Sequence, residues 1–220
     1  MNSARRRLIR TAPVLAAVWL LGACNGLTRD DLSSLYEAAE GMWSKGSDVT
    51  LEEAAAVPYA SIGLRFGGGS ETMLVLASDS NGQLLWTSSL RIAITTRDGR
   101  IVETAGFRYN LRGFVSLTDK PDENGERTIR WQGDFPELGL YSVVVTCRSR
   151  VAGEDKIVVL GKSIDTRRIE ESCNTDSRQL NWSYRNIYWT DPEDGLVWRS
   201  IQHVNPELDA IEIETLRPPA

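Results

Sequence analysis

The chain has 220 residues, of which 41% are hydrophobic, and a formal net charge of −5. This length is enough to bury one substantial core, and no shift in composition divides the chain, so we expect one folded domain. The first 23 residues carry four Arg and no acidic residue, which leaves residues 24–220 with a net charge near −9. Such a charge repels polyanions, and the composition therefore argues against nucleic-acid binding.

The N-terminus has the pattern of a secretory signal. Basic residues at positions 5–7 and 10 precede an apolar run over residues 12–21. This run is too short to span a hydrocarbon core of about 30 Å as a helix. It leads into Leu21-Gly22-Ala23-Cys24, which has the form of a lipobox, where the Cys thiol accepts a diacylglycerol before cleavage. Residues 1–23 are therefore predicted to be a lipoprotein signal peptide and Cys24 the lipidated first residue of the mature protein. An ordinary secretory signal or an uncleaved anchor is the alternative.

The predicted anchor would hold the protein on a membrane without spanning it. A diacylglycerol thioether and an N-acyl chain bury many methylene groups, each contributing about 0.8 kcal/mol, so the attachment would be stable. Asn25 stands where an Asp commonly signals retention in the inner membrane, and this favours the outer membrane. The Arg-rich start fits Sec export and also resembles a twin-arginine signal.

Residues 24–57 are predicted to form a lipidated tether with two helices. Over residues 28–43, apolar side chains recur at helical spacing behind the N-cap Thr28 and two early acidic residues. A shorter helix is predicted over residues 51–56, because Thr50 and Glu53 can form a capping box and Pro58 ends the helix. The first helix is expected to cover an edge or open end of the domain; docking on a partner or on lipid headgroups is the alternative.

From residue 59 onward the apolar residues alternate with a period of two, which is typical of β-strands. Asp98-Gly99 is the strongest hairpin signal, because these residues tolerate the positive φ of a two-residue turn. Residues 118–126 are interpreted as a polar loop and residues 153–155 as a turn. Eleven strands are predicted, over residues 60–66, 72–78, 84–96, 100–105, 128–134, 141–151, 156–160, 168–172, 180–189, 197–203 and 210–216.

No helical segment of crossover length separates these strands, so parallel pairing is disfavoured. Residues 58–220 are therefore predicted to form an all-β domain, mostly antiparallel, with about eleven strands and a short N-terminal helical segment before them. So many strands in one domain should close into a barrel-like sheet or fold into a sandwich, because both arrangements leave few edges exposed.

Aromatic residues near the C-terminus form a candidate saccharide platform. Trp182, Tyr184 and Tyr188 share one parity along a predicted strand, and Trp198 follows a turn over residues 191–195. Sugars stack their apolar ring faces on exposed aromatic rings, whereas packing in a core accounts for most Trp residues in proteins. Both interpretations stay open at this stage.

Residue types needed for common catalytic and metal sites are sparse. His203 is the only histidine and no Gly-x-Ser-x-Gly pattern is present, which argues against a Ser-His-Asp hydrolase. A zinc site would need further His or Cys at ligand spacing. Among thirty acidic residues, no pattern singles out the two that a glycosidase would need. No catalytic residue, metal or cofactor is therefore predicted.

Cys147 and Cys173 lie in or near predicted strands. In an oxidising periplasm they could form a disulfide that closes a loop of about 25 residues and contributes about 3 kcal/mol. The alternative is a pair of buried free thiols.

Several short motifs together resemble one family, the YjbF/GfcB lipoproteins of group 4 capsule and exopolysaccharide clusters. The resemblance spans roughly residues 58–218, and no motif in it is a catalytic signature. The motifs are Pro58-Tyr59-Ala60-Ser61, Leu74-Val75-Leu76-Ala77, Thr95-Thr96-Arg97-Asp98-Gly99-Arg100, Asn110-Leu111, Arg130-Trp131, Gly195-x-Val197-Trp198-Arg199-Ser200-x-Gln202, Asn205-Pro206 and Glu214-x-Leu216-Arg217-Pro218.

This resemblance implies a non-enzymatic accessory factor of polysaccharide export, lipid-anchored at the periplasmic face of the outer membrane. Its expected partners are the membrane, the exported polysaccharide and other products of an exopolysaccharide gene cluster. A saccharide-binding module and, behind it, a periplasmic polysaccharide hydrolase are the alternative functions. The role in polysaccharide export rests on the resemblance alone, because fold by itself does not specify function.

Overall fold

The computed structural model describes residues 48–121, 126–175, 177 and 179–219. The predicted signal peptide over residues 1–23, the lipidation site Cys24 and the helix predicted over residues 28–43 lie outside these ranges. Within them, no helix has the length and apolar character needed to cross a membrane.

Helix α2 (Leu51–Ala56) confirms the shorter of the two predicted helices. The Thr50 hydroxyl accepts a hydrogen bond from the backbone N–H of Glu53 at 3.2 Å, and the Glu53 carboxylate accepts one from the backbone N–H of Thr50 at 2.8 Å. This capping box satisfies two N–H groups, including one that the first turn of a helix leaves without a partner. The helix ends at Val57, which is extended because Pro58 follows it.

The rest of the described chain is nearly all antiparallel β-structure, which confirms the predicted fold class. A short 3-10 helix, η1 (Pro136–Leu138), lies between β7 and β8. The described residues form twelve strands: β1 (Ser61–Phe66), β2 (Thr72–Ser80), β3 (Gln83–Thr87), β4 (Ala93–Arg97), β5 (Arg100–Ala105), β6 (Arg112–Pro121), β7 (Arg127–Phe135), β8 (Leu140–Val159), β9 (Lys162–Thr175), β10 (Ser183–Thr190), β11 (Val197–Gln202) and β12 (Ile211–Arg217).

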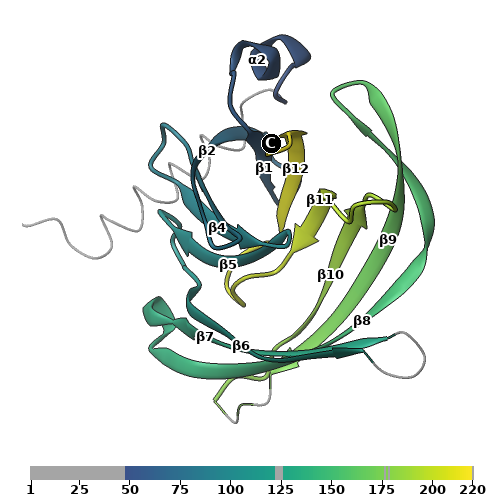
Figure 1. Ribbon diagram of the computed structural model, residues 1–220. Coiled ribbons are helices and arrows are strands. Elements are labelled where there is room, and N and C mark those ends of the chain that lie inside the picture. Colours follow the sequence, from purple (N-terminus) through teal and green to yellow (C-terminus); the bar gives the residue numbers. More distant parts are fainter. Residues whose placement is uncertain (1–47, 122–125, 176, 178, 220) are drawn as a thin grey trace, which may run out of the picture. The chain divides into compact units, whose positions relative to one another are not determined.

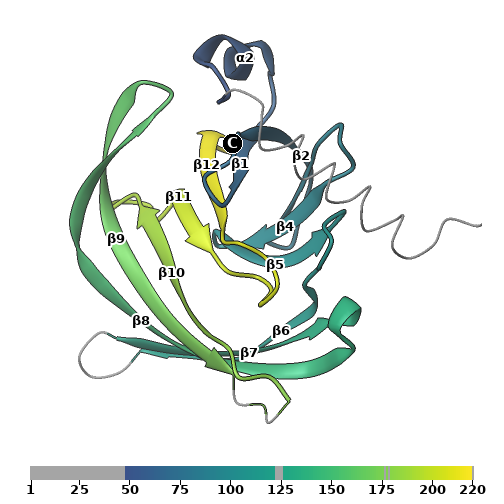
Figure 2. The same ribbon diagram turned by 180° about the vertical axis from the view of Figure 1, so that it is seen from behind.

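The strands form one sheet in the order β5-β4-β3-β2-β1-β12-β11-β10-β9-β8-β7-β6. Neighbours in sequence are neighbours in the sheet, except that β1 pairs with β12 and β5 does not continue into β6. Figures 1 and 2 show the sheet curling around until β5 and β6 approach each other. Of the two predicted arrangements, the structure is therefore the nearly closed, barrel-like sheet.

The seam between β5 and β6 begins at the connection that joins them, where Thr104 N donates to Leu111 O at 3.0 Å. Farther along, backbone groups at the start of β5 find their hydrogen-bond partners in β11, on another wall of the sheet. The backbone N–H of Ile101 donates to Oε1 of Gln202 in β11 at 2.9 Å, and Gln202 Nε2 donates to Gly99 O at 2.8 Å. A side chain thus takes over part of the hydrogen bonding that a neighbouring strand would otherwise supply.

The core lies inside the curled sheet and is built from alternating positions of the strands. In β10, for example, Asn186, Tyr188 and Thr190 are buried and the residues between them are more exposed. Burial of apolar surface contributes about 25 cal/mol per Å², so this continuous core is the main stabilising contribution. Its largest fully buried apolar side chains are Phe135, Leu64, Leu74, Ile92, Ile94, Leu111, Ile211 and Val145.

The predicted hairpin at Asp98-Gly99 is confirmed. Arg97 pairs with Arg100, and Asp98 and Gly99 have φ values of 49° and 76°. The neighbouring prediction of one strand over residues 84–96 is wrong, because the chain turns between β3 and β4. Ser88 N donates to Ile92 O at 3.0 Å, and this turn contains neither Gly nor Pro, so the sequence carries no strong turn signal there.

Two further predictions differ from the structure. Strand β6 was not predicted, and its end occupies residues 118–121 of the segment that was interpreted as a polar loop. Residues 153–155 lie inside the long strand β8 and do not form a turn; Gly153 stands at a register shift in the β8–β9 pairing. The turn instead lies at Leu160 and Gly161, with φ values of 48° and 78°. Leu is unusual at positive φ, which explains why the sequence did not indicate this turn.

Candidate functional site

A largely buried ion pair connects two strands, β5 and β9, that are not neighbours in the sheet. Arg100 of β5 holds Glu171 of β9 with both guanidinium Nη atoms; one of these contacts, Nη1 to Oε2, measures 3.0 Å. Glu171 is 1% exposed, and its Oε2 also accepts a hydrogen bond from Nδ2 of Asn186 at 2.9 Å. Burial alone would lower the pKa of Arg100, but its electrostatic interactions with Tyr188 and Glu171 raise that pKa above its usual value. Arg100 therefore stays charged, and its contact with Glu171 joins β5 to the opposite wall of the sheet.

Gln202 extends this polar network along β11. Its Oε1 accepts from the Tyr188 hydroxyl at 3.3 Å, and its Nε2 donates to Ser200 Oγ at 2.9 Å. The Arg100 guanidinium lies 5.7 Å from the centre of the Tyr188 ring. Burial raises the pKa of Tyr188 above its usual value, so this hydroxyl stays protonated. The network is arranged to hold strands together, since its polar groups are directed at one another.

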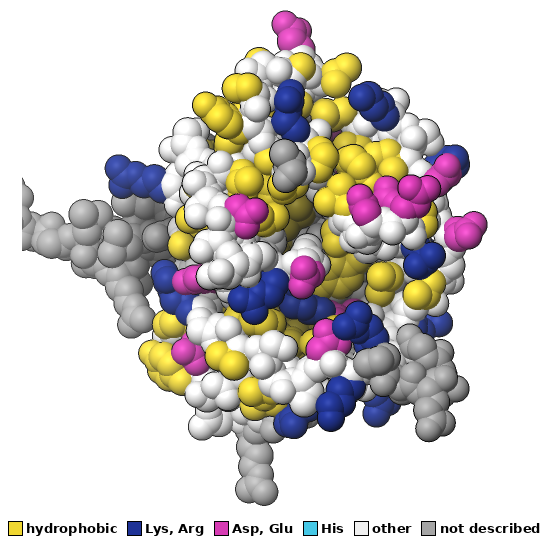
Figure 3. Space-filling model, viewed as in Figure 1, with side chains coloured by type: hydrophobic (Ala, Val, Ile, Leu, Met, Phe, Trp, Pro, Cys, Tyr) yellow, Lys and Arg dark blue, Asp and Glu magenta, His cyan; other side chains and the backbone are white. Residues whose placement is uncertain are grey.

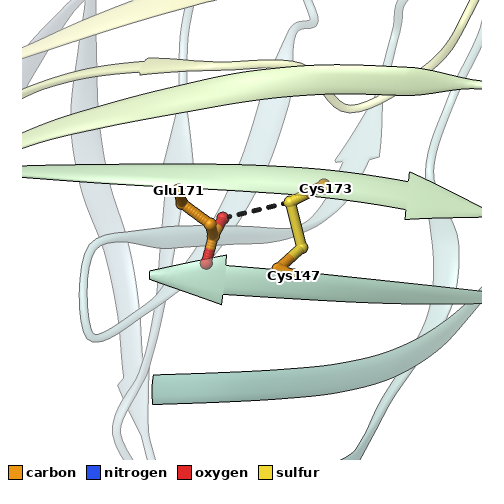
Figure 4. A group of neighbouring side chains, drawn as sticks. All are labelled: Cys147, Glu171 and Cys173. Carbon is orange, nitrogen blue, oxygen red and sulfur yellow. Dashed lines mark hydrogen bonds between the residues drawn. A yellow bond between two sulfur atoms is a disulfide. The ribbon is translucent and has the colours of Figure 1, made fainter. Parts of the chain in front are cut away.

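Cys147 of β8 and Cys173 of β9 are directly paired residues, and their sulfur atoms are bonded at 2.07 Å (Figure 4). Figure 4 shows the Glu171 carboxylate beside the disulfide, with its Oε2 3.5 Å from the Cys173 sulfur. All three side chains could in principle offer ligand atoms to a metal ion, because these atoms lie within 4.8 Å of one another. As a disulfide, however, the two sulfurs are not thiolates and are poor ligands.

The four aromatic residues predicted as a saccharide platform do not form one surface. Trp182 and Tyr184 stack on each other with ring centres 4.0 Å apart, and Trp182 packs edge-on against Phe135 inside the sheet. Tyr188 is 7% exposed, so its inclusion in an exposed platform is wrong. Its side chain lies on the face of β10 that packs inside the sheet. Trp198 lies elsewhere, in a groove near α2.

His203 is half-buried beside these rings, 5.6 Å from the centre of Tyr184. Burial lowers its pKa below the usual value, so the imidazole is neutral at pH 7. Within the described part of the chain, its Nδ1 has no hydrogen-bond partner, and the same holds for the Tyr184 hydroxyl and for Nδ2 of Asn205. These three buried polar atoms belong to β10 and to the start of the β11–β12 connection.

Two clefts lie at the ends of the sheet. The smaller, of about 380 Å³, is lined by α2, the tip of the β8–β9 hairpin, Trp198 and the end of β12. Figure 3 shows apolar side chains gathered in this region, between α2 and the hairpin. The larger, of about 760 Å³, is lined by the β1–β2, β5–β6 and β11–β12 connections, with Leu64, Phe66, Ile92 and Phe107 among its apolar residues.

Comparison with known proteins identifies the family. Residues 32–216 match the family described as "Group 4 capsule polysaccharide lipoprotein gfcB, YjbF". The chain belongs to this family. The resemblance drawn from its short motifs is thereby confirmed, and the family description associates its members with group 4 capsule polysaccharide.

Relatives and a solved structure agree with the family match. The lipoprotein YjbF of Escherichia coli (strain K12) is 27% identical over 209 residues, which cover 90% of this chain and 93% of YjbF. The lipoprotein GfcB of the same strain is 22% identical over 179 residues, covering 78% and 83% of the two chains. The crystal structure of the lipoprotein YmcC from Escherichia coli (K12) has the same fold, with a TM-score of 0.63 at 20% identity, covering 88% of this chain and 97% of YmcC.

Several residues that carry the family resemblance belong to the features described above. Ser200 and Gln202 lie in the interior network, and Asn205-Pro206 begins the connection that lines the larger cleft. Arg199 binds the carboxylate of Glu214 across the β11–β12 pair, with Nε 2.9 Å from Oε2. These motif residues therefore stabilise the domain, in addition to any role at a binding surface.

Neither the Arg100–Glu171 pair nor the larger cleft was predicted from the sequence. The two charged residues are 71 positions apart, and each looks like an ordinary surface residue of an alternating strand. The cleft is assembled from three connections that lie far apart in the chain. No local pattern marks such sites, because only the curvature and pairing of the sheet bring their parts together.

Proposed function

We propose that this protein is a lipid-anchored accessory factor in the export or assembly of a capsule or exopolysaccharide. It is held through Cys24 at the periplasmic face of the outer membrane and acts there by contact, without catalysis. Its partners are the exported polysaccharide and other products of the same gene cluster. The observation that carries the proposal is the family match over residues 32–216, with the lipobox motif at residues 21–24 shortly before it.

The contacts in the described domain support a role as a stable scaffold. Glu171, its most deeply buried carboxylate, is held by Arg100 and Asn186. A general acid or base needs a position from which it can reach substrate, and these contacts hold Glu171 in the core instead. His203 directly follows the end of β11 and lies beside the Tyr184 ring. Both arrangements favour stabilisation of the fold over chemistry.

Gene deletion tests the proposal. The gene is deleted, the strain is complemented with the wild-type chain or with an empty vector, and surface polysaccharide is quantified. We expect a loss of surface polysaccharide that the wild-type chain restores. Unchanged secretion in the deletion strain, while the other genes of the cluster are expressed, would contradict the proposed role.

A second measurement separates contact from catalysis. Polysaccharide isolated from the same strain is incubated with the purified full chain and then sized by gel filtration. We expect the chain-length distribution to stay unchanged over time. A progressive shift to shorter chains, absent with heat-inactivated protein, would favour the hydrolase alternative.

A further inference from the structure

We infer that the larger cleft binds a short segment of polysaccharide. The inference rests on the proposed function, which brings the protein into contact with glycan, and it assigns that contact to specific residues. The cleft is defined by the β1–β2, β5–β6 and β11–β12 connections. Its volume, about 760 Å³, lies in the range of small-molecule sites, about 300–1,000 Å³.

The floor of the cleft is apolar and partly aromatic. Phe66 and Phe107 meet edge to face, with ring centres 5.1 Å apart, and the side chains of Leu64 and Ile92 also line the cleft. The C–H face of a pyranose ring is apolar and packs well on such rings, while its hydroxyls project sideways. A surface of this kind recognises a sugar ring without requiring that the ligand carry a charge.

Tyr109 is held in place at the rim by its own turn. Asn110 accepts a hydrogen bond from Phe107 N at 3.2 Å and donates to Phe107 O at 2.9 Å, and Glu137 accepts from both the backbone N–H and Nδ2 of Asn110 at 3.0 and 2.8 Å. The Arg108 guanidinium lies 5.4 Å from the centre of the Tyr109 ring. Because these contacts exist before any ligand arrives, less conformational entropy is lost on binding.

Two carboxylates also line the cleft. Glu207 and Asp209 belong to the β11–β12 connection, which is shaped by Asn205 accepting from Glu207 N at 3.0 Å. Asp209 packs directly on the β1–β2 turn: a Cβ on Gly67, whose φ is +49°, would come within 2.8 Å of its Oδ2. Only glycine fits this approach, so the turn residue and the carboxylate form one unit. A carboxylate accepts several hydrogen bonds and can bridge neighbouring sugar hydroxyls.

The same charges disfavour other classes of ligand. Glu207 and Asp209 would repel a phosphate or another strongly anionic group. An acyl chain is disfavoured as well, because it would displace water from the two carboxylates and offer them no hydrogen bonds in return. A polyhydroxylated ligand satisfies both parts of the cleft, because it combines an apolar ring face with hydroxyl donors for the carboxylates.

Binding is measured on the full chain, purified in detergent with its anchor. The probe is a set of oligosaccharides released by partial acid hydrolysis from the surface polysaccharide of the producing strain, titrated by calorimetry. We expect saturable binding that Tyr109→Ala and Asp209→Asn each weaken by about tenfold, since each removes one contact of the order of a good hydrogen bond or stacked ring. Matched controls are Tyr59→Ala, at a tyrosine that is 64% exposed, and Asp165→Asn, at a carboxylate side chain that is 78% exposed. Unchanged melting temperatures confirm that each variant is folded.

Three results would overturn the inference: no binding by the wild-type chain, unchanged binding by both folded cleft variants, or equal weakening by the controls. These outcomes are separable from failure of the proposed function. If deletion abolishes surface polysaccharide but the oligosaccharides do not bind, the accessory role stands and the cleft is not its glycan site. If the oligosaccharides bind in the cleft but deletion has no effect, the binding site stands and the export role does not.

Discussion

Replacing Arg100 with methionine tests how the open edge of the sheet is held. The substitution keeps much of the side-chain volume but leaves the Glu171 carboxylate, which is 1% exposed, with Asn186 as its remaining charge-stabilising contact among those described above. Removing one partner of a buried ion pair typically costs about 3–5 kcal/mol, because the other charge stays buried without compensation. For a domain of this size we expect the melting temperature to fall by about 6–20 °C.

The free energy of unfolding is measured by urea denaturation and the melting temperature by a thermal scan. Both use the full chain under oxidising conditions and are followed by Trp fluorescence. Arg127→Met is the matched control, because Arg127 pairs with Asp119 at the surface, where the two side chains are 55% and 41% exposed. An exposed pair of this kind contributes about 0–1 kcal/mol. The double variant Arg100→Met/Glu171→Gln removes both charges and should recover part of the lost stability.

The reasoning is refuted if Arg100→Met costs no more than the Arg127→Met control. It is also refuted if Glu171→Gln lowers the free energy of unfolding by the same amount in the Arg100→Met variant as in the wild type. Either result would mean that the β5 edge is held by the surrounding apolar core and by Gln202, with no net contribution from the ion pair.

Three further outcomes are expected. Cys24→Ser should release the protein from the outer-membrane fraction, because the acyl acceptor is lost; a variant that still fractionates with that membrane would show that lipid is not the anchor. Cys147→Ala/Cys173→Ala should lower the free energy of unfolding by about 3 kcal/mol, measured by urea denaturation, because the disulfide closes a loop with a sequence separation of 26; equal stability of the two proteins would contradict this. Hydrogen bonds from Asn110 outweigh burial and lower the pKa of Glu137 from 4.5. The ionised carboxylate therefore stabilises the folded protein above that pH, and this stabilisation is lost as the pH falls through the lower folded-state pKa. Melting temperatures between about pH 5 and 3 should therefore fall more steeply for the wild type than for Glu137→Gln, and parallel curves would argue against a role for this contact.

The local pattern of the sequence was sufficient for the parts of the structure that depend on neighbouring residues. Spacing along one segment was enough to predict the capping box of Thr50 and Glu53 and the Asp98-Gly99 hairpin. It also predicted that Trp182, Tyr184 and Tyr188 share one side of their strand. The antiparallel fold class follows as well, since no segment between the strands could serve as a crossover helix. The family match agrees with the motifs because those motifs are local too.

Tertiary structure alone decided which strands close the sheet and what the interior side chains do. The sequence alternates apolar and polar residues in the same way whether the sheet closes into a barrel or folds into a sandwich, so the β1–β12 pairing had no local signal. Parity placed Tyr188 on one face of its strand but not inside the domain, and nothing near Arg100 in the chain indicates Glu171 as its partner. The cleft beneath Tyr109 and Asp209 has the same origin, because contacts between distant connections depend on the curvature of the whole sheet.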